Sequence, residues 1–279
     1  MTNAFWRRFL VPGALWLAFF FAVPFGIAIA ISFGQAAEFG GVIYGWNPEN
    51  YADALDPLFA PILLRSVGYA AATAFLCLAI GYPVAYTIAR YGGRWKNALI
   101  ALVLLPFLIN YLVRTYAWVA LLSDEGLLSR VAGEPLGVIN TPVAVIGGLV
   151  YGYLGFMILP IYASLERMDP ALIEAGKDLY GSRFQTFRHV TWPTTFQGVL
   201  AGTVLVFLPA VGDFVSAQLL GGPDTFMVGN LIQQQFFGAE NWPFGAALTT
   251  VMMLFLMVWM VFYLRSAARA AREGSAAAV

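Results

Sequence analysis

The sequence predicts an all-α membrane protein with six transmembrane helices, and two observations carry this prediction. Of the 279 residues, 60% are hydrophobic and only 11% are charged, and several mostly apolar runs exceed 20 residues. A helix of about 20 apolar residues spans the roughly 30 Å hydrocarbon core of a bilayer. Because these runs lack the period-two alternation of a membrane barrel, helices are expected rather than strands.

The expected spans cover residues 9–33, 61–89, 97–122, 141–165, 193–220 and 244–264, so 1–279 is interpreted as a single transmembrane domain. The first run could instead be a signal peptide, because Arg7 and Arg8 precede it and Ala28-Ile29-Ala30 resembles a cleavage site. Its apolar stretch is longer than a typical signal core of about 7–15 residues, so a retained span is favoured. Kinks are expected within the spans at Pro83, Pro106, Pro160 and Pro209.

The basic residues predict the orientation of the spans. Of the 15 Lys and Arg residues, 12 fall on one side, whereas only Arg130 lies clearly in a loop on the other. Since cytoplasmic loops are rich in Lys and Arg, both termini are expected in the cytoplasm. The 15 acidic residues balance the basic ones, which argues against nucleic acid as a partner. The twelve are Arg7, Arg8, Arg90, Arg94, Lys96, Arg167, Lys177, Arg183, Arg188, Arg265, Arg269 and Arg272.

The loop at 166–192 is polar, and its residues predict a cytoplasmic helix between spans four and five. Asp169 can cap the amino terminus of a helix, and Pro170 suits its first position. Gly181 can end the helix in a left-handed conformation. One apolar face of this helix is expected to hold Leu172, Ala175 and Leu179.

A second short helix is expected after the glycine, because Ser182 and Gln185 have the spacing of a capping box. Pro193 then begins the next span. Two interpretations of this paired-helix loop remain open. It could be an interfacial amphipathic segment that only anchors to lipid, or it could be a docking element for a cytoplasmic partner.

The loop resembles the "EAA" loop of type I ABC importer permeases. In that pattern E-A-A precedes three residues, a glycine, nine residues and I-x-L-P. Here Glu174-Ala175-Gly176 has a glycine in place of the second alanine, the later glycine is displaced by one residue to Gly181, and Pro193 keeps its spacing. The other departures from the pattern are Tyr180, Val190 and Trp192.

Longer segments are similar to the B-type permease subunits of spermidine/putrescine importers, over roughly residues 50–247. They include "LDPLFAPILLRS", "GYPVAY", "NWPFGAA" and the run that begins "TPVAVIGGLVYGYLGF". The resemblance implies a non-enzymatic permease subunit of an ATP-driven importer in a bacterial inner membrane. It also implies a polyamine or a related small organic solute, delivered by a periplasmic binding protein.

The resemblance further implies a division of labour with other subunits. Partners would be a second homologous permease, an ATPase subunit dimer and the binding protein, within the lipid bilayer. The sequence holds no G-x-x-x-x-G-K-[ST] phosphate loop, so ATP is expected to bind the ATPase and no cofactor is expected on this chain. The expected coupling contact with the ATPase consists of Glu174, Ala175, Gly176, Leu179, Gly181 and Pro193.

Two charges, Arg114 and Asp213, lie inside the expected spans at similar depth in the outer half. A charge there costs about 2.5–3.5 kcal/mol on insertion scales, so each needs a partner or water. They could form a structural salt bridge, or one or both could line the translocation pathway. In the pathway interpretation, Asp213 and aromatic faces attract a cation. The aromatic candidates are Tyr111, Tyr116, Trp118, Tyr151 and Tyr153.

An ion-coupled secondary transporter that uses Asp213 as a proton or ion site is the alternative to the importer. The helical polar loop separates the two, because a secondary transporter has no need of an ATPase dock. No catalytic residue is expected, since neither an H-E-x-x-H motif nor a second aspartate occurs in the spans. His189 is the only histidine and has no ligand-spaced companions, so no metal site is expected.

Overall fold

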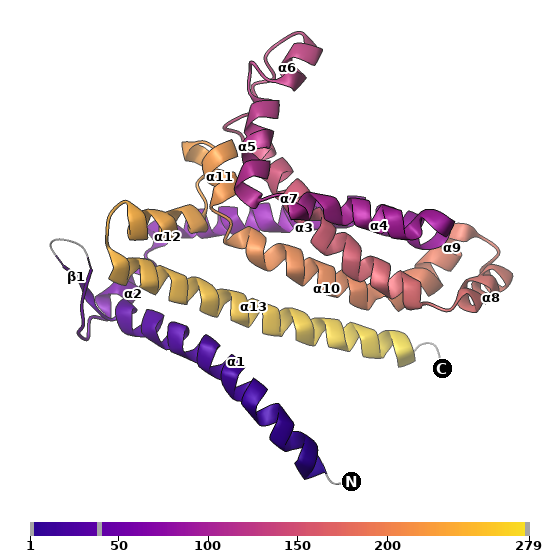
Figure 1. The fold of residues 1–279 in the computed structure, drawn as a ribbon, viewed down its shortest axis with the longest axis horizontal. Helices are drawn as coiled ribbons and strands as arrows, with labels where there is room; N and C mark the ends of the chain where they lie inside the picture. Colours follow the sequence, from indigo (N-terminus) through magenta and orange to yellow (C-terminus); the bar gives the residue numbers. More distant parts are fainter. Residues whose placement is uncertain (1–2, 38–40, 277–279) are drawn as a thin grey trace. The chain divides into compact units, whose positions relative to one another are not determined.

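The computed structural model describes residues 3–37 and 41–276, and almost all of its elements are helices (Figure 1). Within the described residues, five helical stretches are long and apolar enough to cross a membrane, and a bent helix pair makes a sixth span if it is counted as one. The fold class expected from the composition is therefore confirmed. The five long helices are α1 (Asn3–Ser32), α3 (Ala60–Tyr91), α7 (Pro142–Arg167), α10 (Trp192–Val211) and α13 (Trp242–Ala276).

The chain divides into two compact units, and the first consists of residues 1–60 and 231–257. After α1, the short strands β1 (Gln35–Ala36) and β2 (Val42–Ile43) pair antiparallel. Helix α2 (Glu49–Ala54) and the 3-10 turn η1 (Pro57–Phe59) follow. Asn50 donates to the carbonyls of Ser32 and Gly34 at 2.8 and 2.9 Å, so it satisfies one carbonyl that the end of α1 leaves open and one in the segment that follows.

The second unit consists of residues 61–230 and 258–279, and α7 packs along α10 at its centre (Figure 1). Gly198 and Gly202 of α10 lie four residues apart on the contact. A Cβ atom at Gly198 would lie 2.6 Å from the Pro160 carbonyl oxygen, and one at Gly202 would lie 3.2 Å from the Met157 backbone. The two glycines therefore let the helices approach closely, as small residues do in membrane helix pairs.

The third expected span, 97–122, is not one straight helix. It consists of α4 (Lys96–Leu104), the 3-10 turn η3 (Leu105–Leu108) and α5 (Tyr111–Leu122), and the two arms meet at 91°. Pro106 lacks an N–H, and Ile109 has extended backbone angles. Asn110 then restarts the chain as a helix, because its side chain accepts from the Leu112 N–H at 2.9 Å. The short helix α6 (Leu127–Ala132) follows α5.

The fifth expected span, 193–220, is also broken. Helix α10 ends at Val211, and α11 (Val215–Leu220) begins after three intervening residues. Asp213 therefore lies in the break and not inside a helix, which corrects its expected placement. The 3-10 turn η5 (Pro223–Thr225) and α12 (Val228–Phe237) lead on to α13.

The polar loop 166–192 forms the predicted helix, turn and second helix. Helix α8 (Pro170–Tyr180) begins where Asp169 accepts from the Ala171 N–H at 2.9 Å. It ends at Gly181, whose φ of 66° is left-handed as expected. Ser182 accepts from the Gln185 N–H at 3.1 Å and starts α9 (Arg183–Thr186). Contrary to expectation, the second helix is not separate, because the π-helical turn η4 (Phe187–Thr191) joins it to α10.

Candidate functional site

Asp213 is bonded by groups from three elements of the second unit. It is 6% exposed, and its Oδ2 accepts from the Tyr111 hydroxyl of α5 and, at 2.9 Å, from the Tyr153 hydroxyl of α7. Its Oδ1 accepts from the backbone N–H of Ser216 at 2.8 Å, which orders the first turn of α11. The Tyr111 hydroxyl also lies 2.8 Å from the Ser216 hydroxyl. The carboxylate thus joins α5 and α7 to the break after α10.

Arg114 is buried beside this cluster but does not pair with Asp213. The ion pair found among the described residues joins Lys96 and Glu166 instead, with 2.8 Å between Nζ and Oε2. Arg114 donates from Nη1 to the Pro106 carbonyl at 3.1 Å. The proposed salt bridge between the two in-span charges is therefore not formed, because other groups satisfy both. The Arg114 guanidinium also lies over three aromatic rings, those of Phe107, Tyr111 and Tyr151, at 5.2–5.7 Å.

Arg114 is expected to hold the bend of the third span. Replacing Arg114 with Gln removes the cation–π contacts and leaves the Pro106 carbonyl with a poorer donor. We expect a loss of about 1–3 kcal/mol of stability, read as a lower melting temperature in detergent. Arg130→Gln is the matched control, because Arg130 is exposed on α6. Equal melting temperatures for the two variants would contradict this role.

A cleft of about 610 Å³ opens beside the bend. Both Tyr111 and Tyr153, the two tyrosines that bind Asp213, line it together with Arg114 and Asn110. Asp213 itself is not among the lining residues, so its charge reaches the cleft through the two tyrosines. The structure therefore brings together Arg114, Asp213, Tyr111 and Tyr153 from the set named by the sequence.

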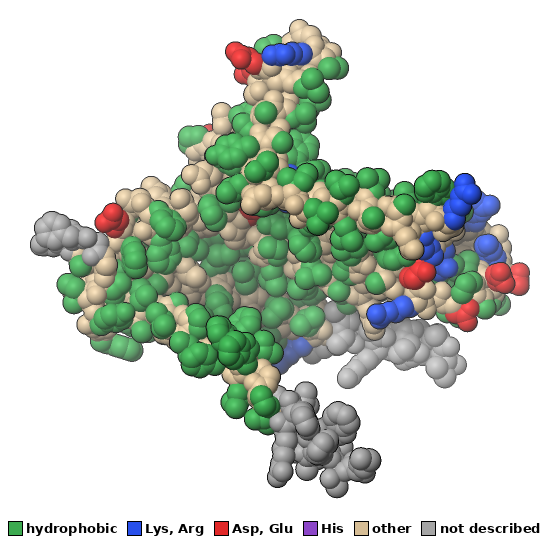
Figure 2. Space-filling view, viewed as in Figure 1, with side chains coloured by type: hydrophobic (Ala, Val, Ile, Leu, Met, Phe, Trp, Pro, Cys, Tyr) green, Lys and Arg blue, Asp and Glu red, His purple; other side chains and the backbone are tan. Residues whose placement is uncertain are grey.

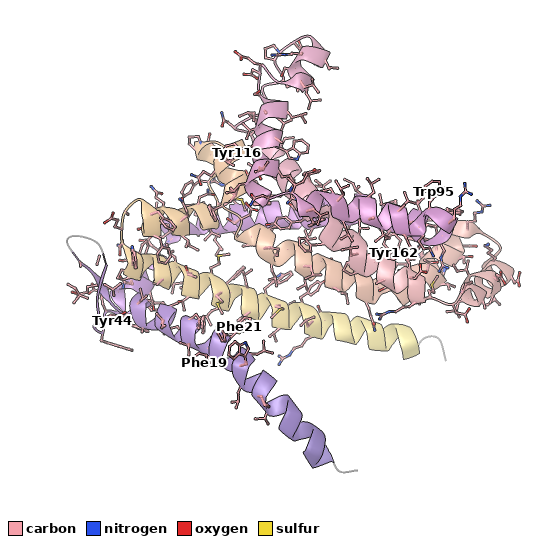
Figure 3. All side chains as sticks on the ribbon, in the orientation of Figure 1. Phe19, Phe21, Tyr44, Trp95, Tyr116 and Tyr162 are labelled. Carbon is pink, nitrogen blue, oxygen red and sulfur yellow. The ribbon has the colours of Figure 1, made fainter. Side chains whose placement is uncertain are left out.

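The other aromatic candidates lie farther along α5 and α7. Trp118 and Tyr151 are in edge-to-face contact at a centroid distance of 5.4 Å, and both line a second pocket of about 430 Å³ that also includes Arg114. Tyr116 of α5 is 59% exposed (Figure 3) and lines neither pocket. Only two of the five aromatic candidates thus contact the Asp213 carboxylate.

Ser216 and Asn110 are not among the site residues predicted from the sequence, although each has a local signal there. Asp213 precedes Ser216 by three residues, which is the spacing of a side chain that caps a helix start. Asn110 directly precedes the apolar run of α5 and follows Pro106 by four residues. Within residues 3–37 and 41–276, no group of three or more His, Cys, Asp or Glu side chains is placed to hold a metal ion.

The second candidate site is helix α8, in which a buried glycine lies beside exposed leucines. Gly176 is buried, and a Cβ atom there would lie 2.9 Å from methyl groups of Thr186 and Val190. At 3.6 residues per turn, Leu172 and Leu179 lie within about 60° of Gly176 around the helix, and they are 47% and 78% exposed. The predicted apolar face, Leu172, Ala175 and Leu179, is therefore exposed within the described part of the chain, which leaves it available to a partner.

The remaining residues of the expected coupling contact are all exposed. Glu174 and Ala175 are exposed on α8, and Gly181 closes the helix. Pro193 is exposed in the first turn of α10, beyond the π-helical turn. Figure 2 shows Lys and Arg side chains, together with several Asp and Glu side chains, at this end of the second unit, whereas mostly hydrophobic side chains cover the helices away from it.

The family described as "Binding-protein-dependent transport system inner membrane component" matches residues 78–272. The spermidine/putrescine transport system permease protein PotB of Haemophilus influenzae is 38% identical over 254 residues, which cover 88% of this chain and 89% of that protein. The protein of the same name from Escherichia coli strain K12 is 39% identical, with coverage of 88% and 92%.

Solved structures share the fold. A chain of the bacterial alginate ABC transporter, solved in complex with an alginate pentasaccharide-bound periplasmic protein, has a TM-score of 0.72 at 17% identity, and 96% of each chain is covered. A chain of the MetNI methionine ABC transporter in an inward-facing conformation has a TM-score of 0.56 at 16% identity, covering 78% of this chain and 96% of that one. At such identities the likeness shows the fold alone.

Proposed function

Since the chain belongs to the binding-protein-dependent transport system inner membrane components, it is a non-enzymatic permease subunit of an ABC importer, and we propose that it moves spermidine, putrescine or a related polyamine. The family favours this class over the ion-coupled secondary transporter that uses Asp213. The polyamine proposal rests on one observation, the 38–39% identity to two permeases named for spermidine and putrescine over 88% of this chain.

The cleft beside the bend gives this proposal a chemical basis. Tyr111 and Tyr153 line it, and each donates its hydroxyl to the buried Asp213 carboxylate. A polyamine carries ammonium groups, which are attracted to a carboxylate and to the faces of aromatic rings. Arg114 already occupies the face of Tyr111, so a passing cation competes with it for that ring. We infer that Arg114 holds the Tyr111 ring in the arrangement that lines the cleft.

We propose that α8 is the element that couples the permease to ATP hydrolysis. The partners are a second homologous permease, an ATPase dimer and a periplasmic binding protein, and ATP binds only to the ATPase. The exposed leucines of α8 and the close packing of Gly176 against η4 support this assignment. Movement of the ATPase would then pass through α8 and the continuous helix of α9, η4 and α10 into the break at Asp213.

We further propose that the chain lies in a bacterial inner membrane, with α8 and both termini in the cytoplasm. The basic residues support this orientation, because the end of the second unit that carries α8 also carries Arg90, Arg94, Lys96 and Arg183. Lys and Arg near the ends of spans favour the cytoplasmic side.

ATP hydrolysis by the reconstituted transporter tests the solute. Vesicles that hold this chain with its co-purifying subunits would receive the binding protein, either empty or loaded with spermidine. We expect severalfold faster ATP hydrolysis with the spermidine-loaded protein. The polyamine assignment would be contradicted if the empty binding protein stimulated ATP hydrolysis equally. It would also be contradicted if only binding protein loaded with an anionic solute stimulated hydrolysis. Either result would leave the importer class intact.

A further inference from the structure

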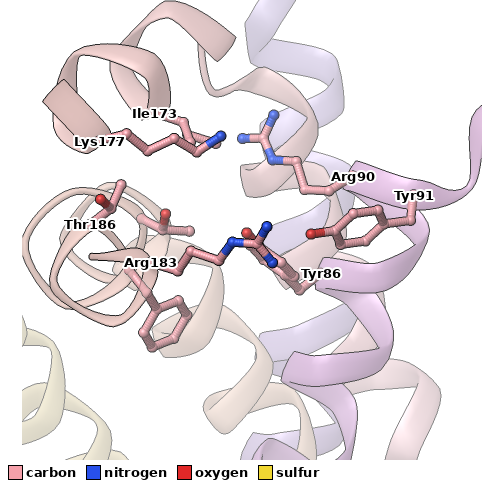
Figure 4. A pocket seen from close by; sticks show the side chains of 9 residues that line it. Tyr86, Arg90, Tyr91, Ile173, Lys177, Arg183 and Thr186 are labelled. Atoms are coloured by element: carbon pink, nitrogen blue, oxygen red, sulfur yellow. The ribbon is translucent and has the colours of Figure 1, made fainter. Parts of the chain in front are cut away.

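A pocket of about 370 Å³ lies between the carboxyl end of α3 and the segment of α8, α9 and η4 (Figure 4). Three basic side chains line it, Arg90 of α3, Lys177 of α8 and Arg183 of α9. As Figure 4 shows, the Lys177 amine and the two guanidinium groups extend toward the same space. The remaining lining residues are Tyr86, Tyr91, Ile173, Thr186, Phe187 and Thr191, so the pocket lining contains no carboxylate.

Arg90 is attracted electrostatically by Glu166 but makes no hydrogen bond through two of its donor atoms among the described residues. Its Nε and Nη2 atoms are buried and have no hydrogen-bond partner within the described residues. Buried donors are normally paired, and an unpaired donor of a charged group costs more than a neutral one. The carboxylate of Glu166 is taken by Lys96, whose Nζ lies 2.8 and 3.0 Å from its two oxygens.

The lining brings together three like charges with no carboxylate among its residues, so the pocket is suited to an anion. A phosphate group offers several acceptor oxygens to such donors, and guanidinium groups match its geometry. Polar and aromatic surface surrounds the basic groups and is supplied by Thr186, Thr191, Tyr86 and Tyr91.

The place of the pocket favours a lipid source for this phosphate. Tyr91 is 72% exposed and Trp95 is 62% exposed where α3 ends and the next helix begins. Exposed Tyr and Trp residues mark the level of the phospholipid headgroups, and basic pockets between membrane helices bind anionic headgroups there. We propose that Arg90, Lys177 and Arg183 bind the phosphate of an anionic phospholipid, which ties α8 to the end of α3.

Lipid titration of the assembled transporter in detergent tests this site. The binding of phosphatidylglycerol would be measured by native mass spectrometry for the double variant Lys177→Gln/Arg183→Gln. The double variant Arg167→Gln/Arg188→Gln is the control, because it removes the same charge from exposed residues outside the pocket. Each basic residue contributes about 1 kcal/mol of binding free energy to an anionic headgroup. Removal of two is therefore expected to weaken phosphatidylglycerol binding by the Lys177→Gln/Arg183→Gln variant roughly 30-fold. The control should bind as the unmodified protein does.

Two further probes separate the sources of the phosphate. Phosphatidylcholine should bind far more weakly than phosphatidylglycerol, and inorganic phosphate at millimolar concentration should not displace the lipid. Displacement by inorganic phosphate would overturn the lipid source in favour of a soluble anion. Equal phosphatidylglycerol binding by the two double variants would overturn the lipid site. That result is expected if a carboxylate of the ATPase fills the pocket in the assembled complex.

Discussion

Replacing Gly181 with Val is expected to reduce ATP-driven uptake about five- to thirtyfold while the protein still inserts into the membrane. Gly181 ends α8 with a φ of 66°, a conformation that a β-branched residue adopts only at a cost. That cost is about 1–2 kcal/mol, and each 1.4 kcal/mol is a factor of ten. The strain falls on the turn between α8 and α9, so it acts on the helix proposed to dock on the ATPase.

Gly181→Asn is the matched control, because Asn tolerates the left-handed conformation far better than Val. A Cβ atom at Gly181 meets nothing within 4 Å, so the two substitutions differ in backbone strain and not in steric contact with neighbours. We expect near-normal uptake for Asn and a large loss for Val, at equal amounts of inserted protein. Normal uptake by the Val variant would remove the coupling role of this turn.

Replacing Asp213 with Asn is expected to reduce spermidine uptake about 30-fold per folded molecule. One unit charge acting over about 8 Å, at an effective dielectric constant of about 20, contributes about 2 kcal/mol. The same change also costs about 1–3 kcal/mol of stability. An amide offers one acceptor oxygen where Asp213 now accepts from Tyr111, Tyr153 and the Ser216 N–H.

Tyr153→Phe separates the two effects of Asp213. It removes one hydrogen bond to the carboxylate and keeps the charge, so it should lower stability while uptake per folded molecule stays close to normal. Folded protein would be quantified by size-exclusion chromatography before uptake is compared. If Asp213→Asn and Tyr153→Phe lose folded protein equally and keep equal uptake per folded molecule, Asp213 has only a structural role.

Local signals in the sequence predicted the polar loop well. The Asp169 cap, the Gly181 turn and the Ser182 cap all appear where the residues place them. Each depends on hydrogen bonds between residues two to four positions apart, so the sequence alone specifies it. The joining of α9 to α10 was missed, because a π-helical turn has no comparable sequence signature.

The breaks in the spans were harder to predict from the sequence. Residues 97–122 form one apolar run, so hydropathy does not distinguish a straight span from two helices at 91°. The carboxylate of Asp213 is bonded by Tyr111, which lies 102 residues away in the chain. Such a contact depends on how α5 packs beside α7 and α11, and no local pattern reports it. The expectation that buried charges pair with each other therefore failed for Arg114.

Uptake into vesicles tests most directly the claim that ATP drives transport through this chain. Vesicles containing the chain with its co-purifying subunits would be given either internal ATP or an imposed proton gradient. Labelled spermidine would be supplied with the binding protein on the outside. Uptake is expected to require both ATP and the binding protein, and no uptake is expected with the gradient alone. Uptake driven by the gradient without ATP would contradict the account.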